Sequence, residues 1–278
     1  GKRLAMLKAR VLTALVMLPI ALLILFVLPE DAFALCVGLI ILVGAWEWIR
    51  LSGLVSHLLT LTLLVVFSGV LYWSYLLPSV YVPMLLGIGC IFWIGAAAMV
   101  MMYPRSKEQV GGKYVKLGFG LLVLIPAYVA LLYLRRHDAH LLLLALLVTI
   151  IWAADVGAYF VGRQFGTTKL APKVSPGKSW AGLIGGMILA LAVGMLGAFI
   201  GEPSDHLISP IPWAVFIGIV AVTVLFSVLG DLFESLIKRE QGVKDSSSLL
   251  PGHGGVLDRL DGIFLGVPVS FLFLILQH

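Results

Sequence analysis

Charged side chains are scarce in this sequence of 278 residues: Asp, Glu, Lys and Arg make up 12% of it, about half of the roughly 25% usual in soluble domains. Hydrophobic residues make up 61%, and the mean hydropathy is +1.09. So little polar surface cannot cover a water-soluble fold of this size, which excludes an ordinary cytosolic enzyme, a disordered chain and a fibrous repeat. The apolar runs are also far longer than the strands of a membrane barrel. We therefore predict an all-α, polytopic integral membrane protein.

Cysteine is almost absent as well. Cys36 and Cys90 both lie inside apolar runs, so the sequence offers neither a disulfide framework nor a zinc site. The apolar run after Arg10 is too long for a typical signal peptide. We expect one membrane-embedded domain over residues 1–278, with residues 1–5, which precede Met6, as a non-native addition.

Nine apolar segments are long enough to be transmembrane helices. They are residues 11–29, 32–49, 54–76, 82–103, 117–134, 139–161, 180–200, 211–235 and 260–276. If the N-terminus is cytoplasmic, almost all Lys and Arg residues between these segments fall on the cytoplasmic side. The net charge of +5 is therefore explained by membrane sidedness, without nucleic acid, and predicts an N-in, C-out topology. Only Arg135 and Arg136 fall on the opposite side, and the sequence offers no reason for them.

Three aspartates lie at helix ends near the predicted cytoplasmic face. Asp258 and Asp261 are three residues apart and share one helix face. Asp231, Ser235 and Lys238 form another stripe, at spacings of four and three residues. Carboxylates that converge in this way suit magnesium. Helix capping is the alternative: it would explain Asp258 at a helix start, but not Asp231 near a helix end, so the spacing favours metal ligation.

The loop between these two helices combines cations, small hydroxyl groups and glycines, which is typical of a phosphate cradle. A flexible basic loop without a ligand is the alternative. His253 could be a phosphate donor, a general acid or base, or a turn residue, and the sequence does not decide between these roles. The polar residues are Lys238, Arg239, Lys244, Asp245, Ser246, Ser247, Ser248 and His253.

A second basic loop, residues 169–180, precedes the seventh predicted helix. Gly177-Lys178-Ser179 looks like the end of a P-loop, but Pro172 stands where that motif needs glycine, and no strand is expected before it. We therefore exclude a P-loop. Ser175, Lys178 and Ser179 still suit phosphate, and anchoring to anionic lipid is an equal alternative.

Two further carboxylates lie inside predicted spans. Asp155 comes late in the sixth span, in the run Asp155-Val-Gly-Ala-Tyr159. Charges inside membrane segments are costly, so Asp155 is a candidate for function. Glu47 stands between Trp46 and Trp48 and is interpreted as an interfacial charge in an aromatic belt.

The stretch from residue 235 to residue 261 resembles the signature of the phosphatidate cytidylyltransferases, or CDP-diacylglycerol synthases, and above all of the bacterial enzymes. The resemblance extends to residues 169–180, 155–159 and 45–48, so that it covers most of the chain. It places the catalytic motifs within residues 150–262. The positions that carry it are Ser235, Lys238, Arg239, Lys244, Asp245, Pro251, His253, Gly254, Gly255, Asp258, Arg259 and Asp261.

The resemblance implies that a cytidylyl group passes from CTP to phosphatidic acid and that pyrophosphate is released. It implies a multi-pass enzyme of the bacterial inner membrane that works as a homodimer, with an active site facing the cytoplasm. Its partners would be CTP, phosphatidic acid and membrane lipids, with no nucleic acid. It also implies Mg²⁺ held by Asp231, Asp258 and Asp261, and it allows a second, monovalent cation such as K⁺.

The candidate site residues fall into two groups. Because the attacking group is already a phosphate oxyanion, the task is to neutralise and align two anions, which cations can do. The predicted catalytic group is Asp231, Lys238, Arg239, Lys244, Asp245, His253, Asp258, Arg259 and Asp261. The predicted substrate-binding group is Asp155, Tyr159, Lys169, Ser175, Lys178, Ser179 and Ser235.

Three other functions are weighed against this one. A CTP-dependent polyprenol or phytol kinase would transfer the γ-phosphoryl group and release CDP. A secondary transporter would place polar, broken helices near the bilayer midplane, usually with internal repeats, whereas the charges here lie at the cytoplasmic helix ends and no repeat is found. A structural scaffold would not need three aspartates at interfacial depth.

Overall fold

The computed structural model describes residues 15–136, 140–205, 212–250 and 254–277, and almost all of these residues are helical. After a helix at Leu15–Phe26, the long helices are α2 (Glu30–Leu51), α3 (His57–Tyr75), α4 (Val82–Met102), α6 (Lys113–Arg136), α7 (His140–Phe165), α8 (Trp180–Asp205), α9 (Trp213–Glu240) and α10 (Leu257–Gln277). Short elements connect them: η1 (Ser79–Tyr81), α5 (Lys107–Gly111), β1 (Lys169–Ala171) and β2 (Ser175–Ser179).

Seven of the helices are long and apolar enough to cross a membrane, which confirms the all-α, polytopic class. They correspond to the second through eighth predicted segments. The described part of the first segment is the shorter apolar helix Leu15–Phe26, and the ninth segment lies within α10, which is not among the seven. The total of nine spans and their orientation stay predictions.

Several helices continue beyond the predicted apolar segments, and α2 and α9 show that the added residues can be charged. Glu30 and Asp31 form the first turn of α2, and Lys238 and Arg239 lie in the last turn of α9. Acidic residues near a helix N-terminus and basic residues near a C-terminus interact favourably with the helix dipole, so these charges extend the helices beyond their apolar runs. The α9–α10 loop is correspondingly shorter than expected.

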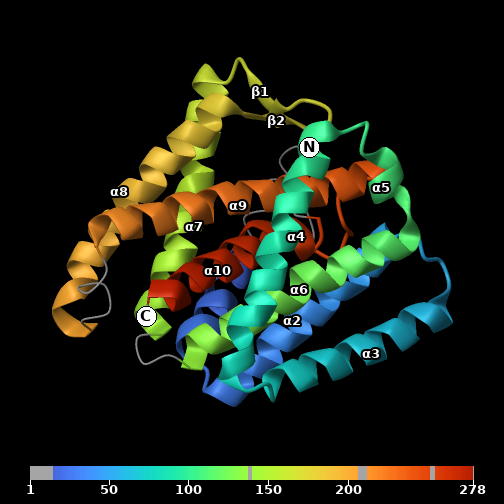
Figure 1. Cartoon of the computed structure of the whole chain (residues 1–278), viewed down its shortest axis with the longest axis horizontal. Coiled ribbons are helices and arrows are strands. Elements are labelled where there is room, and N and C mark those ends of the chain that lie inside the picture. Colours follow the sequence, from blue (N-terminus) through green and yellow to red (C-terminus); the bar gives the residue numbers. More distant parts are fainter. Residues whose placement is uncertain (1–14, 137–139, 206–211, 251–253, 278) are drawn as a thin grey trace.

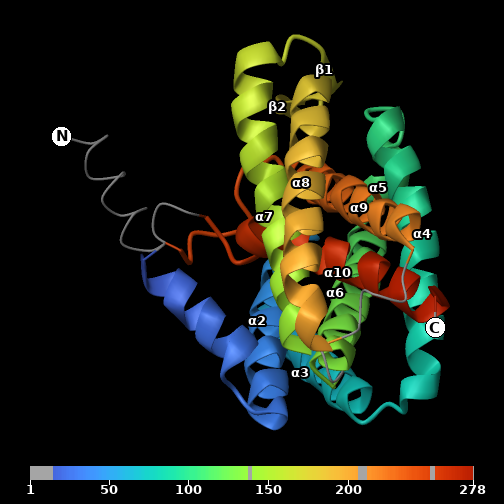
Figure 2. The ribbon, with the colours of Figure 1, turned by 90° about the vertical axis from the view of Figure 1, so that its left-hand side faces the viewer.

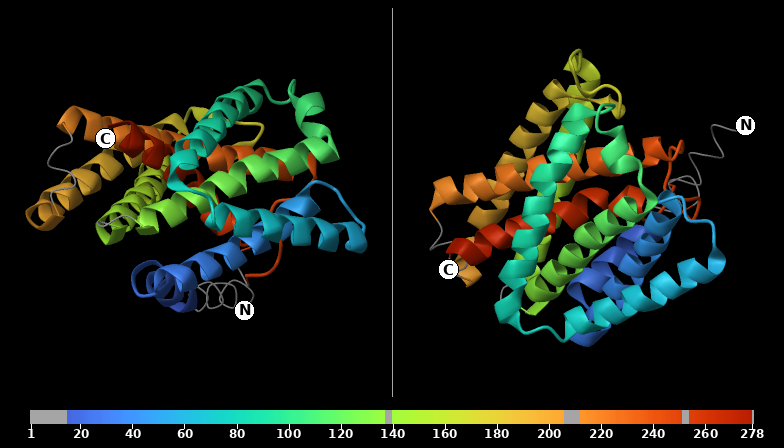
Figure 3. Two further views of the ribbon diagram at one scale, coloured as in Figure 1. Left: turned by 60° about the horizontal axis from the view of Figure 1, so that its bottom comes forward. Right: turned by 45° about the vertical axis from the view of Figure 1, so that its right-hand side comes forward.

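The helices form two groups joined by α9 and α10. One group contains α2, α3, α4 and α6. The other is the α7–α8 pair, whose two helices run side by side and carry the β1–β2 hairpin at one end (Figure 2). α10 packs between α9 and α6, while α9 crosses α4, α7 and α8 (Figures 1 and 3). Helices α9 and α10 therefore bring the two groups together.

The α7–α8 pair packs closely because small residues line its contact. A Cβ atom at Gly157 of α7 would lie 2.6 Å from the carbonyl oxygen of Gly185 on α8. A Cβ atom at Gly186 would lie 2.5 Å from the carbonyl oxygen of Ala154 on α7. Small residues that let two backbones approach are typical of helix contacts inside membranes.

The segment between α7 and α8 was expected to be a loop, but it forms an antiparallel hairpin. Lys169 pairs with Ser179, and Ala171 with Ser175. The Ser179 hydroxyl accepts a hydrogen bond from the backbone N–H of Gly182 at 3.1 Å and so caps α8. The hairpin holds Lys178 between the ends of α7 and α8 and directs it toward α9.

An aromatic cluster fixes the C-terminal half of α9. The Phe233 ring is fully buried, and its centroid lies 5.4 to 6.5 Å from those of Trp48, Phe92, Trp93 and Phe119. These rings come from α2, α4 and α6, and most pairs have the edge-to-face geometry that aromatic rings prefer. The last turns of α9, which carry the predicted site residues Asp231, Ser235, Lys238 and Arg239, are therefore held against three other helices.

Candidate functional site

A polar cluster joins α9 to the hairpin. Lys178 Nζ lies 2.5 Å from Asp231 Oδ2, and it also donates to the carbonyl oxygen of Val228 at 3.4 Å. The Ser235 hydroxyl, one turn further along α9, donates to Asp231 Oδ1 at 3.3 Å. Asp231 keeps 39% of its side chain exposed. Three of the predicted site residues thus meet although the hairpin and α9 are about fifty residues apart in sequence.

Asp155 of α7 completes this group. It lies close enough that the charges of both Lys178 and Asp231 act on its carboxyl group. We call Asp155, Lys178, Asp231 and Ser235 the Asp231 cluster. It holds two carboxylates and one ammonium group, so its formal charge is −1, and it therefore suits a further cation.

A second polar cluster lies one to two turns further along α9. Lys238 Nζ lies 3.0 Å from Glu234 Oε1 and 2.6 Å from Asp258 Oδ1. The three side chains are each at most 10% exposed. A buried ammonium group between two carboxylates ties α9 to the start of α10, and removing one partner would leave an uncompensated charge.

Asp258 is satisfied entirely by protein groups. Besides Lys238 on Oδ1, its Oδ2 atom accepts hydrogen bonds from the backbone N–H of Ser246 and of Gly255, both at 2.8 Å, and from the Ser246 hydroxyl at 2.9 Å. Asp258 precedes the predicted ninth span. Burial alone would raise its pKa, but these hydrogen bonds outweigh burial and hold the pKa below its usual value. Asp258 therefore joins Lys238 of α9 to the loop before α10, and its role as a metal ligand stays a prediction.

Glu47 anchors the same loop from α2. Its carboxylate is fully buried and accepts four hydrogen bonds. The donors are the Ser247 hydroxyl (2.5 Å) and the Val256 N–H (2.9 Å) on Oε1, and the Ser246 hydroxyl (3.0 Å) and the Leu257 N–H (2.8 Å) on Oε2. The interpretation of Glu47 as an interfacial charge was wrong. A carboxylate inside an apolar segment was the available signal, because such a group needs several hydrogen-bond donors.

The paired glycines fit around these carboxylates. Gly254 has a φ of +87°, a conformation that glycine adopts without strain. A Cβ atom at Gly255 would overlap the Ser246 hydroxyl and lie 2.5 Å from Glu47 Oε1. The N–H groups of Gly255, Val256 and Leu257 point at carboxylates of the chain itself. These amides therefore close the loop, and do not form the open phosphate cradle that the sequence suggested.

Five other predicted site residues are exposed and belong to neither cluster. The side chains of Lys169, Lys244, Asp245 and Tyr159 are exposed. Arg239 is exposed and donates from Nε to the carbonyl oxygen of Val174 at 3.3 Å, which ties α9 to the hairpin.

Five predicted residues remain, and the structure describes the side chains of three of them. Ser179 is buried as the cap of α8, and Ser175 is half-buried in β2. Arg259 is exposed in the first turn of α10. Asp261 belongs to α10, but its side chain lies outside the described part of the structure, as does His253 altogether.

The donor chemistry for magnesium differs between the two clusters. Among the side chains that the structure describes, no three His, Cys, Asp or Glu residues form a group that could hold a metal ion. The Asp231 cluster fits nevertheless, because it offers carboxylate oxygens, an unbalanced negative charge and a partly exposed Asp231. Asp258 fits less well, since its side chain is 6% exposed and both oxygens already accept hydrogen bonds.

An apolar groove adjoins the Asp231 cluster. It has a volume of about 470 Å³ and is lined by the hairpin together with α4, α8 and α9. Val228 belongs to its wall, and the Val228 carbonyl oxygen accepts the hydrogen bond from Lys178. The groove and the Asp231 cluster therefore share Val228, although no side chain of the cluster lines the groove.

Comparisons with known proteins all point to one family. The model of the cytidylyltransferase family matches residues 8–277. A Pseudomonas aeruginosa protein named phosphatidate cytidylyltransferase is 42% identical over 282 residues, which cover 95% of each chain. Proteins of the same name from Haemophilus influenzae and Bacillus subtilis are 42% and 30% identical, and the alignments cover 96% and 97% of this chain and 98% of each relative.

Proposed function

We propose that this chain, which belongs to the cytidylyltransferase family, transfers the cytidylyl group of CTP to phosphatidic acid and releases pyrophosphate. The observation that carries the proposal is an apolar groove whose wall includes Val228, the residue that Lys178 of the charged Asp231 cluster contacts. Such a junction suits a substrate with hydrocarbon chains and a phosphate monoester head.

The reaction needs two anions to meet in line. An oxygen of the lipid phosphate forms a bond to the α-phosphorus of CTP, and the bond from that phosphorus to the bridging oxygen of the leaving pyrophosphate breaks. Fixed ammonium groups lower the repulsion between the two phosphates. In this proposal Lys178 contacts the lipid phosphate, because it lies beside Asp231 and hydrogen-bonds to Val228 of the groove wall.

The exposed cations of the loops would bind CTP. Lys244 and Arg239 are exposed near the end of α9, and Arg239 is held by its hydrogen bond to the hairpin. Lys238 has a different role in this proposal. It is buried between Glu234 and Asp258, so it holds α10 in place and reaches no nucleotide.

Magnesium would be held first by Asp231, with Asp155 beside it. When bound, it would neutralise phosphate charge and polarise the α-phosphoryl group. Asp258 and Asp261 stay the predicted ligands from α10. For Asp258 this role requires an oxygen that now accepts a hydrogen bond from Lys238, Ser246 or Gly255. The monovalent cation would have the same carboxylates available.

The acyl chains would lie in the apolar groove while CTP enters from the cytoplasm. The groove is lined by Val100 and Met101 of α4, Lys173 and Val174 of the hairpin segment, and Leu229 and Leu232 of α9. In the N-in, C-out topology these segments all lie at the cytoplasmic face. We propose a bacterial inner-membrane protein on the same grounds, since the loop cations gather on one side.

Identification of the released phosphate species tests the reaction. Purified protein is incubated with phosphatidic acid, CTP and magnesium, and the soluble products are separated by ion-exchange chromatography. The proposal expects pyrophosphate in equal amount to the CDP-lipid formed. Release of CDP, with a newly phosphorylated lipid, would identify a lipid kinase and contradict the proposal.

A further inference from the structure

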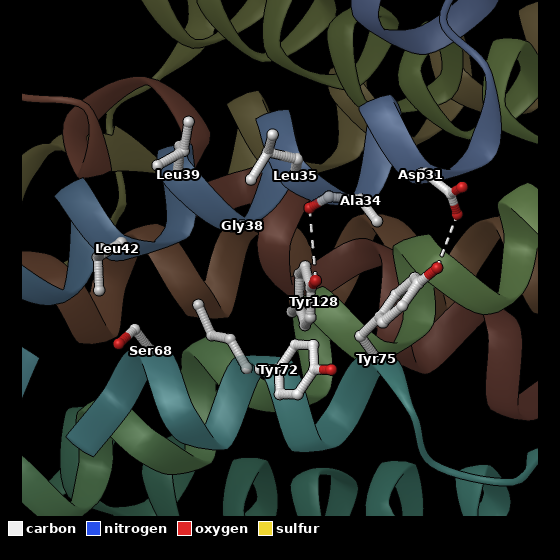
Figure 4. A pocket seen from close by; sticks show the side chains of 11 residues that line it. Asp31, Ala34, Leu35, Gly38, Leu39, Leu42, Ser68, Tyr72, Tyr75 and Tyr128 are labelled. Carbon is white, nitrogen blue, oxygen red and sulfur yellow. Dashed lines mark hydrogen bonds between the residues drawn. The ribbon is translucent and has the colours of Figure 1, made fainter. Parts of the chain in front are cut away.

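A separate pocket lies at the opposite end of α2 from the site. It has a volume of about 320 Å³ and is lined by α2, α3 and the Tyr128 side chain of α6 (Figure 4). Asp31, at its polar end, lies sixteen residues before Glu47, and a helix of that length spans about 24 Å. The polar end of the pocket is therefore far from the loop that Glu47 anchors, and the pocket shares no lining residue with the groove beside the Asp231 cluster.

Tyrosine side chains surround the acidic end of this pocket. The Tyr75 hydroxyl donates to Asp31 Oδ1 at 2.7 Å, and the Tyr128 hydroxyl donates to the carbonyl oxygen of Ala34 at 3.4 Å. In Figure 4 the exposed Tyr72 ring lies below Tyr128, close to the α3 ribbon. Among the residues with described placement, none hydrogen-bonds to Asp31 Oδ2, which is open to a ligand.

Two arginines at the end of α6 lie near this end of α2, and their described hydrogen bonds go to groups other than Asp31. Arg136 Nε lies 2.6 Å from Glu30 Oε1, and its guanidinium group also donates to the Tyr75 carbonyl oxygen at 3.1 Å. Arg135 donates to the carbonyl oxygen of Leu28 at 2.6 Å. The two arginines that the topology could not explain thus fix the turn before α2 to α3 and α6. Neither arginine belongs to the residues that line the pocket, whereas Asp31 does, so the charged group at the polar end of the pocket is a carboxylate.

The rest of the pocket is apolar and opens sideways. Leu35, Leu39 and Leu42 follow one face of α2, and Leu71 lines the facing side on α3. Leu35 and Leu39 are exposed, on a helix long and apolar enough to cross a membrane. A groove at this position faces the hydrocarbon chains of lipids.

We propose that this pocket binds an amine-bearing phospholipid, such as phosphatidylethanolamine, in the leaflet opposite the Asp231 cluster. The ammonium group would lie against Asp31 and the tyrosine rings, which attract cations through charge and through their π-faces. One acyl chain would follow the leucines of α2 into the membrane. A lipid with the same chains but without the amine lacks the charged contact and binds more weakly.

Lipid titration followed by native mass spectrometry tests this site. Delipidated protein in detergent is titrated with phosphatidylethanolamine or phosphatidylglycerol of identical acyl chains, and the dissociation constant of the first bound lipid is compared. We expect the amine lipid to bind about tenfold more tightly, the size of one charge-assisted hydrogen bond. Asp31→Asn keeps an acceptor for Tyr75 but removes the charge, and should abolish this preference.

Two further variants test the groove itself. Leu39→Trp should fill the groove and weaken both lipids, whereas Ile94→Trp, at an exposed position of α4 outside the pocket, should change neither. Equal affinity for the two lipids in the wild-type protein, or an unchanged preference in Asp31→Asn, would overturn the proposal. So would a change of oligomeric state in Leu39→Trp on size-exclusion chromatography, because the groove would then be an interface between two copies of the chain.

Discussion

Replacing Glu47 by Gln tests whether the loop between α9 and α10 depends on α2. Glutamine keeps the size of the side chain, but its NH₂ group donates where the carboxylate oxygen accepted. The remaining oxygen can keep two of the four hydrogen bonds. Of the other two donors, a serine hydroxyl can rotate to accept, whereas a backbone N–H of Val256 or Leu257 cannot. The substitution therefore leaves one buried amide without an acceptor.

The cost follows from these contacts. An unsatisfied buried donor costs about 1–3 kcal/mol, and the surviving hydrogen bonds lose the contribution of the charge. We expect a total loss of about 2–4 kcal/mol, which corresponds to a fall of roughly 5–10 °C in melting temperature for a chain of this size. Because the loop carries Lys244, the KM for CTP should rise in the same variant.

Thermal unfolding in detergent, followed by size-exclusion chromatography, measures the loss. Glu108→Gln is the matched control, since Glu108 is exposed on the short helix α5. The control should melt with the wild-type protein. If Glu47→Gln also melts with the wild type and keeps its KM for CTP, the anchoring role argued for Glu47 is wrong.

The remaining predictions concern the metal, the glycines and the topology. Asp231→Asn should shift the dependence of kcat on magnesium to higher concentrations, while Asp258→Asn should chiefly lower the melting temperature, because its carboxylate is already satisfied; the reverse ranking in magnesium titrations would refute this division. Gly255→Ala has no room for a Cβ atom, so its melting temperature should fall by several degrees, and an unchanged value would contradict the packing of the loop. A single cysteine replacing Lys244 should react with a membrane-impermeant thiol reagent from the cytoplasmic side only, and one replacing Val80 from the other side only; the opposite result would invert the topology.

The helices of this protein are well predicted from its sequence, because long apolar segments in a bilayer form transmembrane helices. Seven predicted segments are long apolar helices in the structure. The boundaries were less predictable, because Glu30 and Lys238 continue their helices beyond the apolar runs. Helix-end charges are stabilised by the dipole and by partners that are distant in sequence, such as Asp258 for Lys238.

The site was predictable in its residues but not in its pairing. The stripe on α9 placed Asp231 beside Ser235, as the hydrogen bond between them confirms. No local pattern shows that Lys178, about fifty residues earlier in the sequence, contacts Asp231. Nor does one show that Glu47, about two hundred residues earlier, accepts hydrogen bonds from the loop before α10. Such contacts depend on how helices pack in space. A single sequence can therefore name these residues without assigning a partner to each.

Tracing the α-phosphorus of CTP tests the central claim most directly. Protein in detergent is given phosphatidic acid, magnesium and CTP labelled at the α-phosphorus, and the label in the lipid fraction is measured for the wild-type chain, Asp231→Asn and Glu108→Gln. The account predicts labelled lipid at equal rates in the wild type and Glu108→Gln, and a rate about 100-fold lower in Asp231→Asn, as a loss of a few kcal/mol of transition-state stabilisation requires. Lipid that acquires label only from γ-labelled CTP, or a wild-type rate in Asp231→Asn, would contradict it.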